Sequence, residues 1–122
     1  MTVREIEKLL DASVFQGEEY RDREVLTACS SDMMSDVLAG KIKRQSLLLT
    51  GLCNPQVVRT AEMMDIICIL LVRGKKPDQN MLQMAQEREI MILSTKYSMF
   101  TASGILYEAG LHGGEEAQWK TH

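Results

Sequence analysis

The sequence predicts an α/β fold, a three-layer helix–sheet–helix sandwich built on a mostly parallel sheet. Residues 46–109 contain three short apolar runs, each followed by a helical pattern, which is typical of parallel strands joined by right-handed crossovers. The run 66–72 is apolar without alternation, which indicates a strand covered on both faces. We therefore expect 46–50, 66–72 and 90–94 to be neighbouring parallel strands, with 66–72 in the central position.

The N-terminal part of the chain predicts shorter elements. Thr2, with Glu5 three residues later, can form a capping box for a helix over residues 3–10. Residues 13–16 and 25–29 are two further strand candidates, because each contains a short apolar stretch.

Helix starts and stops mark the remaining helices. Ser30, Ser31 and Asp32 offer capping oxygens for a helix that runs to about Ala39, and Gly40 can end it. Two later helices begin with their own signals. The Asn54-Pro55 pair places a capping side chain before a proline at the first helical position, and Asp78 can cap the next helix. The expected ranges of the later helices are 55–64, 78–88 and 97–109.

Length and charge favour one ordinary globular domain. The 122 residues carry 14 basic and 17 acidic side chains, a net charge of −3, with 45% hydrophobic residues. This balance gives no drive towards nucleic acid or an anionic membrane. The N-terminus lacks the apolar region of a secretory signal, and no apolar run is long enough to span a bilayer. We expect a cytoplasmic domain over 1–112 and a flexible C-terminal tail over 113–122.

The residues that usually carry catalysis are sparse. Cys29, Cys53 and Cys68 are odd in number and form no CxxC pair, so we expect free thiols and no metal site. His112 and His122 both lie near the C-terminus, and the sequence contains neither GxxxxGK[ST] nor GxGxxG. We therefore expect no enzyme activity and no cofactor.

Small and polar residues follow each expected strand. Because parallel strands bind ligands beyond their carboxyl ends, we expect these residues to share one edge of the sheet. Thr50 and Ser94 would donate hydroxyls, Gly51 would permit close backbone approach, and the helix behind Asn54 could receive an anion. The alternative is that these segments are only caps and turns. The candidate ligand-binding residues are Ser31, Asp32, Thr50, Gly51, Asn54, Gln56, Thr60, Ser94 and Thr95, with Arg73, Lys75 and Lys76 as added positive charge.

Two stretches resemble a known family. LLLTGLCNPQVVRTAEMMDIICILLVRGKKPD and LSTKYSMFTASGILYEAGL are similar to the DRTGG domain, and the resemblance extends over about residues 2–112. Asp32 corresponds to the acid of the family's motif, and Thr50-Gly51 to its threonine and first glycine. Met33 and Leu52 stand where the motif has arginine and the second glycine.

The resemblance implies a fold and a role. DRTGG domains are similar in fold to the N-terminal domains of HPr kinase/phosphorylase and of some Mur ligases. They accompany CBS domains or phosphotransacetylases as regulatory modules and have no chemistry of their own. The resemblance therefore implies a non-catalytic regulatory or sensor domain. Taking the polar strand ends into account, we expect this domain to bind a small anionic, nucleotide-like ligand or a partner protein.

Two other functions remain open from the sequence. One is a structural or adaptor protein without a ligand. The other is a small enzyme that uses Cys53, because a thiolate is stabilised beside a helix N-terminus. We also expect a homodimer, since the N-terminal helix and the pairs Met33-Met34 and Met63-Met64 offer more apolar surface than one sheet needs.

Overall fold

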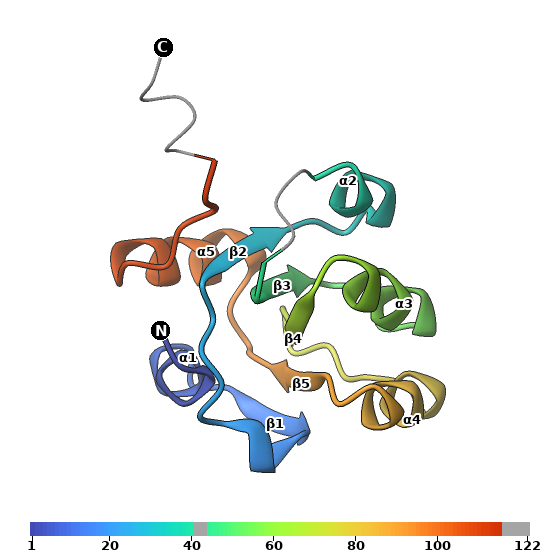
Figure 1. The fold of residues 1–122 in the computed structure, drawn as a ribbon. Helices are drawn as coiled ribbons and strands as arrows, with labels where there is room; N and C mark the ends of the chain where they lie inside the picture. Colours follow the sequence, from blue (N-terminus) through green and yellow to red (C-terminus); the bar gives the residue numbers. More distant parts are fainter. Residues whose placement is uncertain (41–43, 116–122) are drawn as a thin grey trace.

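The fold is a five-stranded sheet between two layers of helices, seen in a computed structural model that describes residues 1–40 and 44–115 (Figure 1). The strand order is β1-β5-β4-β3-β2; β2 to β5 are parallel, and β1 is antiparallel to β5. In chain order the elements are α1 (Val3–Leu9), β1 (Ser13–Gln16), the 3-10 helix η1 (Glu18–Tyr20), β2 (Thr27–Ser30), α2 (Met34–Leu38), β3 (Ser46–Thr50), α3 (Pro55–Met63), β4 (Ile66–Leu71), α4 (Gln79–Glu87), β5 (Met91–Ser94) and α5 (Met99–Glu108).

The predicted core of the sheet is confirmed. β3, β4 and β5 are neighbouring parallel strands with β4 in the middle, and Leu48, Ile69 and Ile92 align across them. The apolar side chains of Ile69 and its neighbours to Val72 are fully buried. An uninterrupted apolar run therefore did mark the strand that both helical layers cover.

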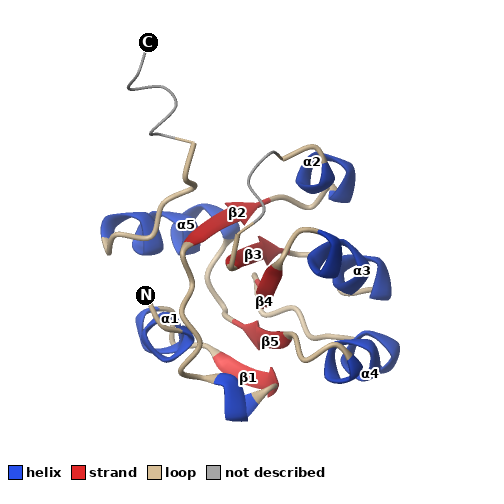
Figure 2. Cartoon of the chain, in the orientation of Figure 1, coloured by secondary structure: helices blue, strands red, loops and turns tan. Residues whose placement is uncertain are grey.

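Each face of the sheet has its own helical layer. Helices α2, α3 and α4 cover one face, and α1 and α5 cover the other (Figure 2). Because successive side chains of a strand point to opposite faces, Leu47 and Leu49 pack with α1 and α5, whereas Leu48 packs with α2, α3 and α4. The three-layer sandwich is thus confirmed.

The helix caps agree with the sequence at two starts and differ at a third. Thr2 Oγ1 accepts from Glu5 N at 3.2 Å, and Asp78 Oδ1 accepts from Met81 N at 2.7 Å. The expectation that Asn54 caps α3 is wrong, because its side chain makes no capping hydrogen bond and its Oδ1 is buried without a partner among the described residues. Pro55 nevertheless occupies the first position of α3, as expected.

The start of α2 is also different from the expectation. Its N-cap is Met33, which makes no side-chain bond to the helix. The hydroxyl of Ser31 instead accepts from Met33 N at 2.9 Å and holds a local turn before the helix. Asp32 makes no capping bond, and its carboxylate turns towards the next strand.

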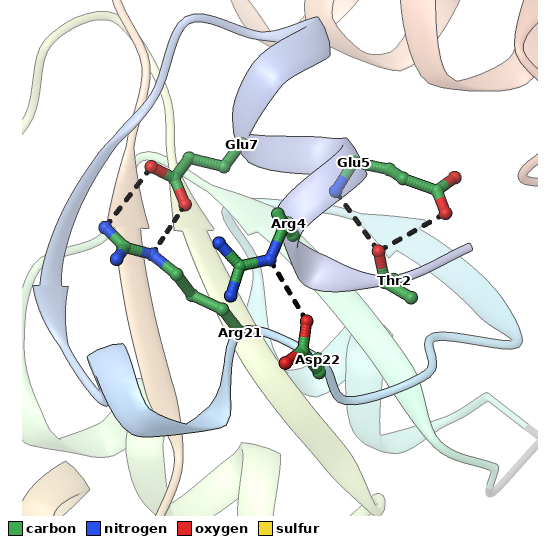
Figure 3. A network of polar contacts seen from close by, with 6 residues as sticks. All are labelled: Thr2, Arg4, Glu5, Glu7, Arg21 and Asp22. Carbon is green, nitrogen blue, oxygen red and sulfur yellow. Dashed lines mark hydrogen bonds and ion pairs between the residues drawn. The ribbon is translucent and has the colours of Figure 1, made fainter.

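The strand expected at 13–16 is confirmed as β1, but its place as an antiparallel edge strand beside β5 was not predicted. Behind β1, η1 leads the chain back beneath α1, where two ion pairs join the segments (Figure 3). Arg4 Nε lies 3.0 Å from Asp22, and Arg21 Nε lies 2.9 Å from Glu7. Such partly exposed pairs contribute little stability, so the burial of Val3, Ile6 and Leu10 holds α1 in place.

Two boundaries expected from the sequence, the start of the second strand and the start of the C-terminal tail, can be compared with the structure. The strand expected at 25–29 begins two residues later, as β2, because Val25 hydrogen-bonds to Met1 O instead of to β3. The tail expected at 113–122 lies outside the described residues from 116 onwards. At its start, His112 O accepts from Ala28 N at 3.0 Å, so the chain there lies along β2.

One buried hydroxyl joins the sheet to α1 and provides a test of this packing. Thr95 Oγ1 donates to Leu10 O at 2.7 Å. Replacing Thr95 by valine keeps the shape but leaves that carbonyl without its donor, which we expect to lower the free energy of unfolding by about 1–3 kcal/mol. Urea denaturation measures the change. The exposed Thr101→Val is the control and should cost far less; equal losses in the two variants would contradict this role of Thr95.

Candidate functional site

The carboxyl ends of β2, β3 and β4 meet at one edge of the sheet, as the parallel arrangement requires. The chain leaves these strands at Ser31, Gly51 and Val72, and the three exits are adjacent because the strands are neighbours. Ser31 N donates to Leu49 O, and Val72 N donates to Thr50 O, which keeps the strands paired up to their last residues. Polar side chains behind these exits are therefore held close together.

Asp32 is the centre of this polar edge. Its Oδ1 accepts from Gly51 N at 2.6 Å and from Thr50 Oγ1 at 3.3 Å. Its Oδ2 lies 3.6 Å from Arg73 Nη2. One carboxylate thus receives a backbone N–H, a hydroxyl and a guanidinium from the ends of two other strands.

Two local features allow this convergence. Gly51 has no side chain, and a Cβ there would overlap the Arg73 guanidinium and lie 3.3 Å from Asp32 Oδ1. Arg73 has a left-handed backbone, with φ of 57°, which turns the chain sharply after β4. Its side chain lies over Gly51, so the missing Cβ of this glycine is what permits the close approach.

The Thr50 hydroxyl adds a second layer to the polar edge. It accepts from Leu52 N at 3.2 Å while it donates to the Asp32 carboxylate. Thr50 itself is fully buried, whereas half of the Asp32 and Arg73 side-chain surfaces is exposed, 50% and 46%. The buried hydroxyl therefore orients a charge pair that solvent and solutes can reach.

The ends of β4 and β5 are arranged differently. The chain leaves β4 for α4 on one face and leaves β5 for α5 on the other, the topology that usually opens a crevice. Here hydrogen bonds join the two exits: Gly74 N donates to Thr95 O at 2.8 Å, and Ser94 Oγ donates to Lys75 O at 2.6 Å. Thr95 Oγ1 donates to Leu10 O. The hydroxyls of Ser94 and Thr95, two of the candidate ligand-binding residues, thus donate to backbone carbonyls of the chain itself.

The other candidate residues lie apart from Asp32 in the hydrogen-bond pattern. Ser31 bonds to its own turn at Met33. Gln56 is exposed on α3, and Thr60 is buried further along that helix. Asn54 leaves its Oδ1 unpaired at the helix start. The structure therefore brings together Asp32, Thr50, Gly51 and Arg73.

Arg73 had been expected only as added positive charge. The signal for a larger role was its position directly behind the central strand, which brings it to the middle of the carboxyl edge. The backbone carbonyl of Lys75 accepts a hydrogen bond from Ser94 Oγ. The Lys75 ammonium is close enough to Cys53 to act on the pKa of its thiol, in the lowering direction.

The cysteines do not support the alternative of a reactive thiolate. Burial raises the pKa of Cys53, and the nearby Lys75 and Arg73 only partly oppose that effect. The Cys53 thiol lies 3.6 Å from Gly51 O, a contact that favours the protonated form. Desolvation by surrounding groups raises the pKa of Cys29 to about 11 although this residue is exposed, and full burial raises the pKa of Cys68 to about 12. All three thiols are thus protonated near neutral pH.

A groove lies to one side of the polar edge and was not expected from the sequence. It has a volume of about 510 Å³ and extends between β2 and α2, with Cys29, Asp36, Val37, Met64 and Glu115 among its lining residues. The described lining residues carry two carboxylates and no basic side chain. An anion is therefore better matched to the polar edge than to this groove.

The part of the chain that the structure describes has neither a cluster suited to a metal ion nor a membrane-spanning helix. No group of three or more His, Cys, Asp and Glu side chains in residues 1–40 and 44–115 is placed to hold a metal ion. None of the helices in these two ranges has both the length and the apolar character needed to cross a bilayer.

The comparisons with known proteins agree with this architecture. A search of curated proteins finds no match. A solved structure with a similar fold contains the CBS and DRTGG domains of the regulatory region of Clostridium perfringens pyrophosphatase, complexed with its activator, diadenosine tetraphosphate. The TM-score is 0.69 and the sequence identity is 18%; the match covers 86% of this chain and 45% of that one.

The family is shown by a match between this sequence and a protein-family model. The model of the DRTGG domain matches residues 5–109, which include all the strands and helices from β1 to α5. The chain therefore belongs to the DRTGG domain family.

Proposed function

We propose that this chain is a non-catalytic regulatory domain that binds a small anionic, nucleotide-like ligand at the polar edge formed by Asp32, Thr50, Gly51 and Arg73. The observation that carries the proposal is that an N–H, a hydroxyl and a guanidinium all turn towards one carboxylate. Donors that hold a carboxylate also suit the oxygens of a phosphate, since both are charge-assisted hydrogen bonds to an oxyanion.

The relatives support a regulatory role. The chain belongs to the DRTGG family, and the similar structure from Clostridium perfringens is a regulatory region bound to a dinucleoside polyphosphate activator. That ligand is a polyanion, which is the class of molecule that the donors of the polar edge would accept. We extend this ligand class, and the regulatory role, to the present chain as part of the proposal.

A non-catalytic role is consistent with the side chains at the edge. Cys53 has a raised thiol pKa, and Asp32 is already hydrogen-bonded to Gly51 and Thr50. Neither is an activated nucleophile. The three free thiols also suit a reducing compartment, so we place the domain in the cytoplasm.

Self-association is the second part of the proposal. Phe100, Gly104 and Tyr107 lie on one face of α5, at the i, i+4 and i+7 positions. Phe100 is 89% exposed and Tyr107 is 51% exposed, and a Cβ on Gly104 would meet no atom within 4 Å. We propose that a second copy of the chain covers this face. A structural or adaptor protein would use the same surface without a ligand at the polar edge.

The proposed dimer contact on α5 differs from the methionine-bearing surface expected from the sequence. Of the two methionine pairs, Met34 and Met64 are buried in the core, and only Met33 and Met63 are exposed. These two side chains belong to the face of α2 and α3, opposite to α5. The exposed aromatic residues therefore favour α5 over the methionine pairs.

Removing the guanidinium of the polar edge tests the ligand proposal. We expect the Arg73→Gln variant to bind pyrophosphate, ATP and diadenosine tetraphosphate about tenfold more weakly than the parent chain, because it loses a charge-assisted contact. Isothermal titration calorimetry measures the three affinities. Arg88→Gln is the matched control, since Arg88 is an arginine of similar exposure that pairs with Glu62 elsewhere. Unchanged affinity in Arg73→Gln, or no binding of any probe to the parent chain, would refute the proposal.

A pair of charge insertions tests the dimer. We expect Phe100→Asp to convert the dimer into the 13.8 kDa monomer, because it places a charge in an apolar contact. Met63→Asp inserts the same charge on the opposite face and should leave the dimer intact. Sedimentation velocity at micromolar concentration measures both. Dissociation by Met63→Asp alone would place the contact on the methionine face, and a monomeric parent chain would refute the dimer.

A further inference from the structure

The Asp32 carboxylate occupies the position that an anionic ligand would need. Its Oδ1 takes the hydrogen bonds of Gly51 N and Thr50 Oγ1, and its Oδ2 faces Arg73. A ligand oxyanion can reach the same donors only when this side chain moves away. The site proposed above is therefore already filled by a group of the chain itself.

We infer that Asp32 is an internal competitor that determines the ligand class of the polar edge: it admits phosphate-type polyanions and excludes monocarboxylates. This inference rests on the proposed anion site. Asp32 selects the ligand by occupying the site, whereas Gly51, Thr50 and Arg73 are the donors that bind the ligand.

The selectivity follows from tethering. A side chain attached beside its donors competes at an effective concentration in about the millimolar range or above. A free monocarboxylate has the same charge and the same two oxygens as Asp32, and it also loses translational freedom on binding. It therefore has no advantage over the resident carboxylate. A phosphate group brings more negative charge and three acceptor oxygens, so it can displace Asp32 from Gly51 and Arg73.

The exposure of the pair permits the exchange. Half of the Asp32 side-chain surface faces solvent, so the carboxylate can swing outward without opening the core. The donors that remain are fixed. Thr50 is fully buried, and the Gly51 amide follows directly on a strand that is paired on both sides. The exchange therefore leaves the donor geometry unchanged.

Release of Asp32 also affects α2. This short helix begins two residues after Asp32, has no side-chain N-cap, and buries only Met34 and Val37. The contacts of Asp32 with Gly51 and Arg73 fix the start of this segment to the neighbouring strands. Because Asp36 and Val37 line the groove of about 510 Å³, displacement of Asp32 would alter one wall of that groove. Ligand binding at the edge would thereby reach a second surface.

The test compares two isosteric, charge-neutralising variants. Asp32→Asn keeps an acceptor oxygen for Gly51 N but removes the competing charge. Asp36→Asn is the matched control, because it makes the same change of charge within α2, away from the donors. Each chain is titrated with pyrophosphate and with acetate, and amide resonances are followed by two-dimensional ¹⁵N NMR. We expect Asp32→Asn to bind pyrophosphate about tenfold more tightly than the parent and to gain acetate binding.

The amide signals report the exchange directly. In the parent chain, pyrophosphate should shift the Gly51 amide together with those of α2. Equal effects of Asp32→Asn and Asp36→Asn on affinity would mean that only overall charge matters, and would overturn the inference while leaving the anion site. Pyrophosphate binding to the parent chain with unmoved Gly51 and α2 amides would also overturn it. Failure of pyrophosphate to bind any of the three chains would refute the proposed site as well.

Discussion

The hydrogen bond from Gly51 N to the Asp32 carboxylate is the contact on which the polar edge depends. Parallel strands bring their carboxyl ends to one edge, and each end leaves backbone groups without a strand partner. Asp32 satisfies one of these at 2.6 Å and also draws Thr50 and Arg73 to itself. The absence of a side chain at Gly51 is what lets Arg73 approach. The site is therefore a consequence of how three strand ends are held together.

The sequence predicted the layers and central strands because their signals are local. The apolar run at β4 and the capping residues Thr2 and Asp78 each act within a few residues of the chain. The antiparallel pairing of β1 with β5 joins residues about 80 positions apart in the register Ser13–Ser94, and short strand patterns carry no information about such a partner.

The candidate site was predicted in part, for the same reason. Asp32, Thr50 and Gly51 do meet, because parallel strands place their exits side by side. Ser94 and Thr95 lie at that edge too, but backbone carbonyls of other segments take their hydroxyls, which no local pattern reveals. Asp32 looked like a helix cap, since Ser and Asp before a helix usually are caps. In the structure, Asp32 instead accepts from Gly51 N, at the end of the next strand.

In the proposed mechanism, the donors around Asp32 form an anion site that the chain itself fills when no ligand is bound. A crystal structure with pyrophosphate tests it most directly. We expect a phosphate oxygen on Gly51 N, with Thr50 and Arg73 as further donors and the Asp32 carboxylate turned out to solvent. An intact bond between Asp32 and Gly51, with pyrophosphate bound at another place on the domain, would contradict it.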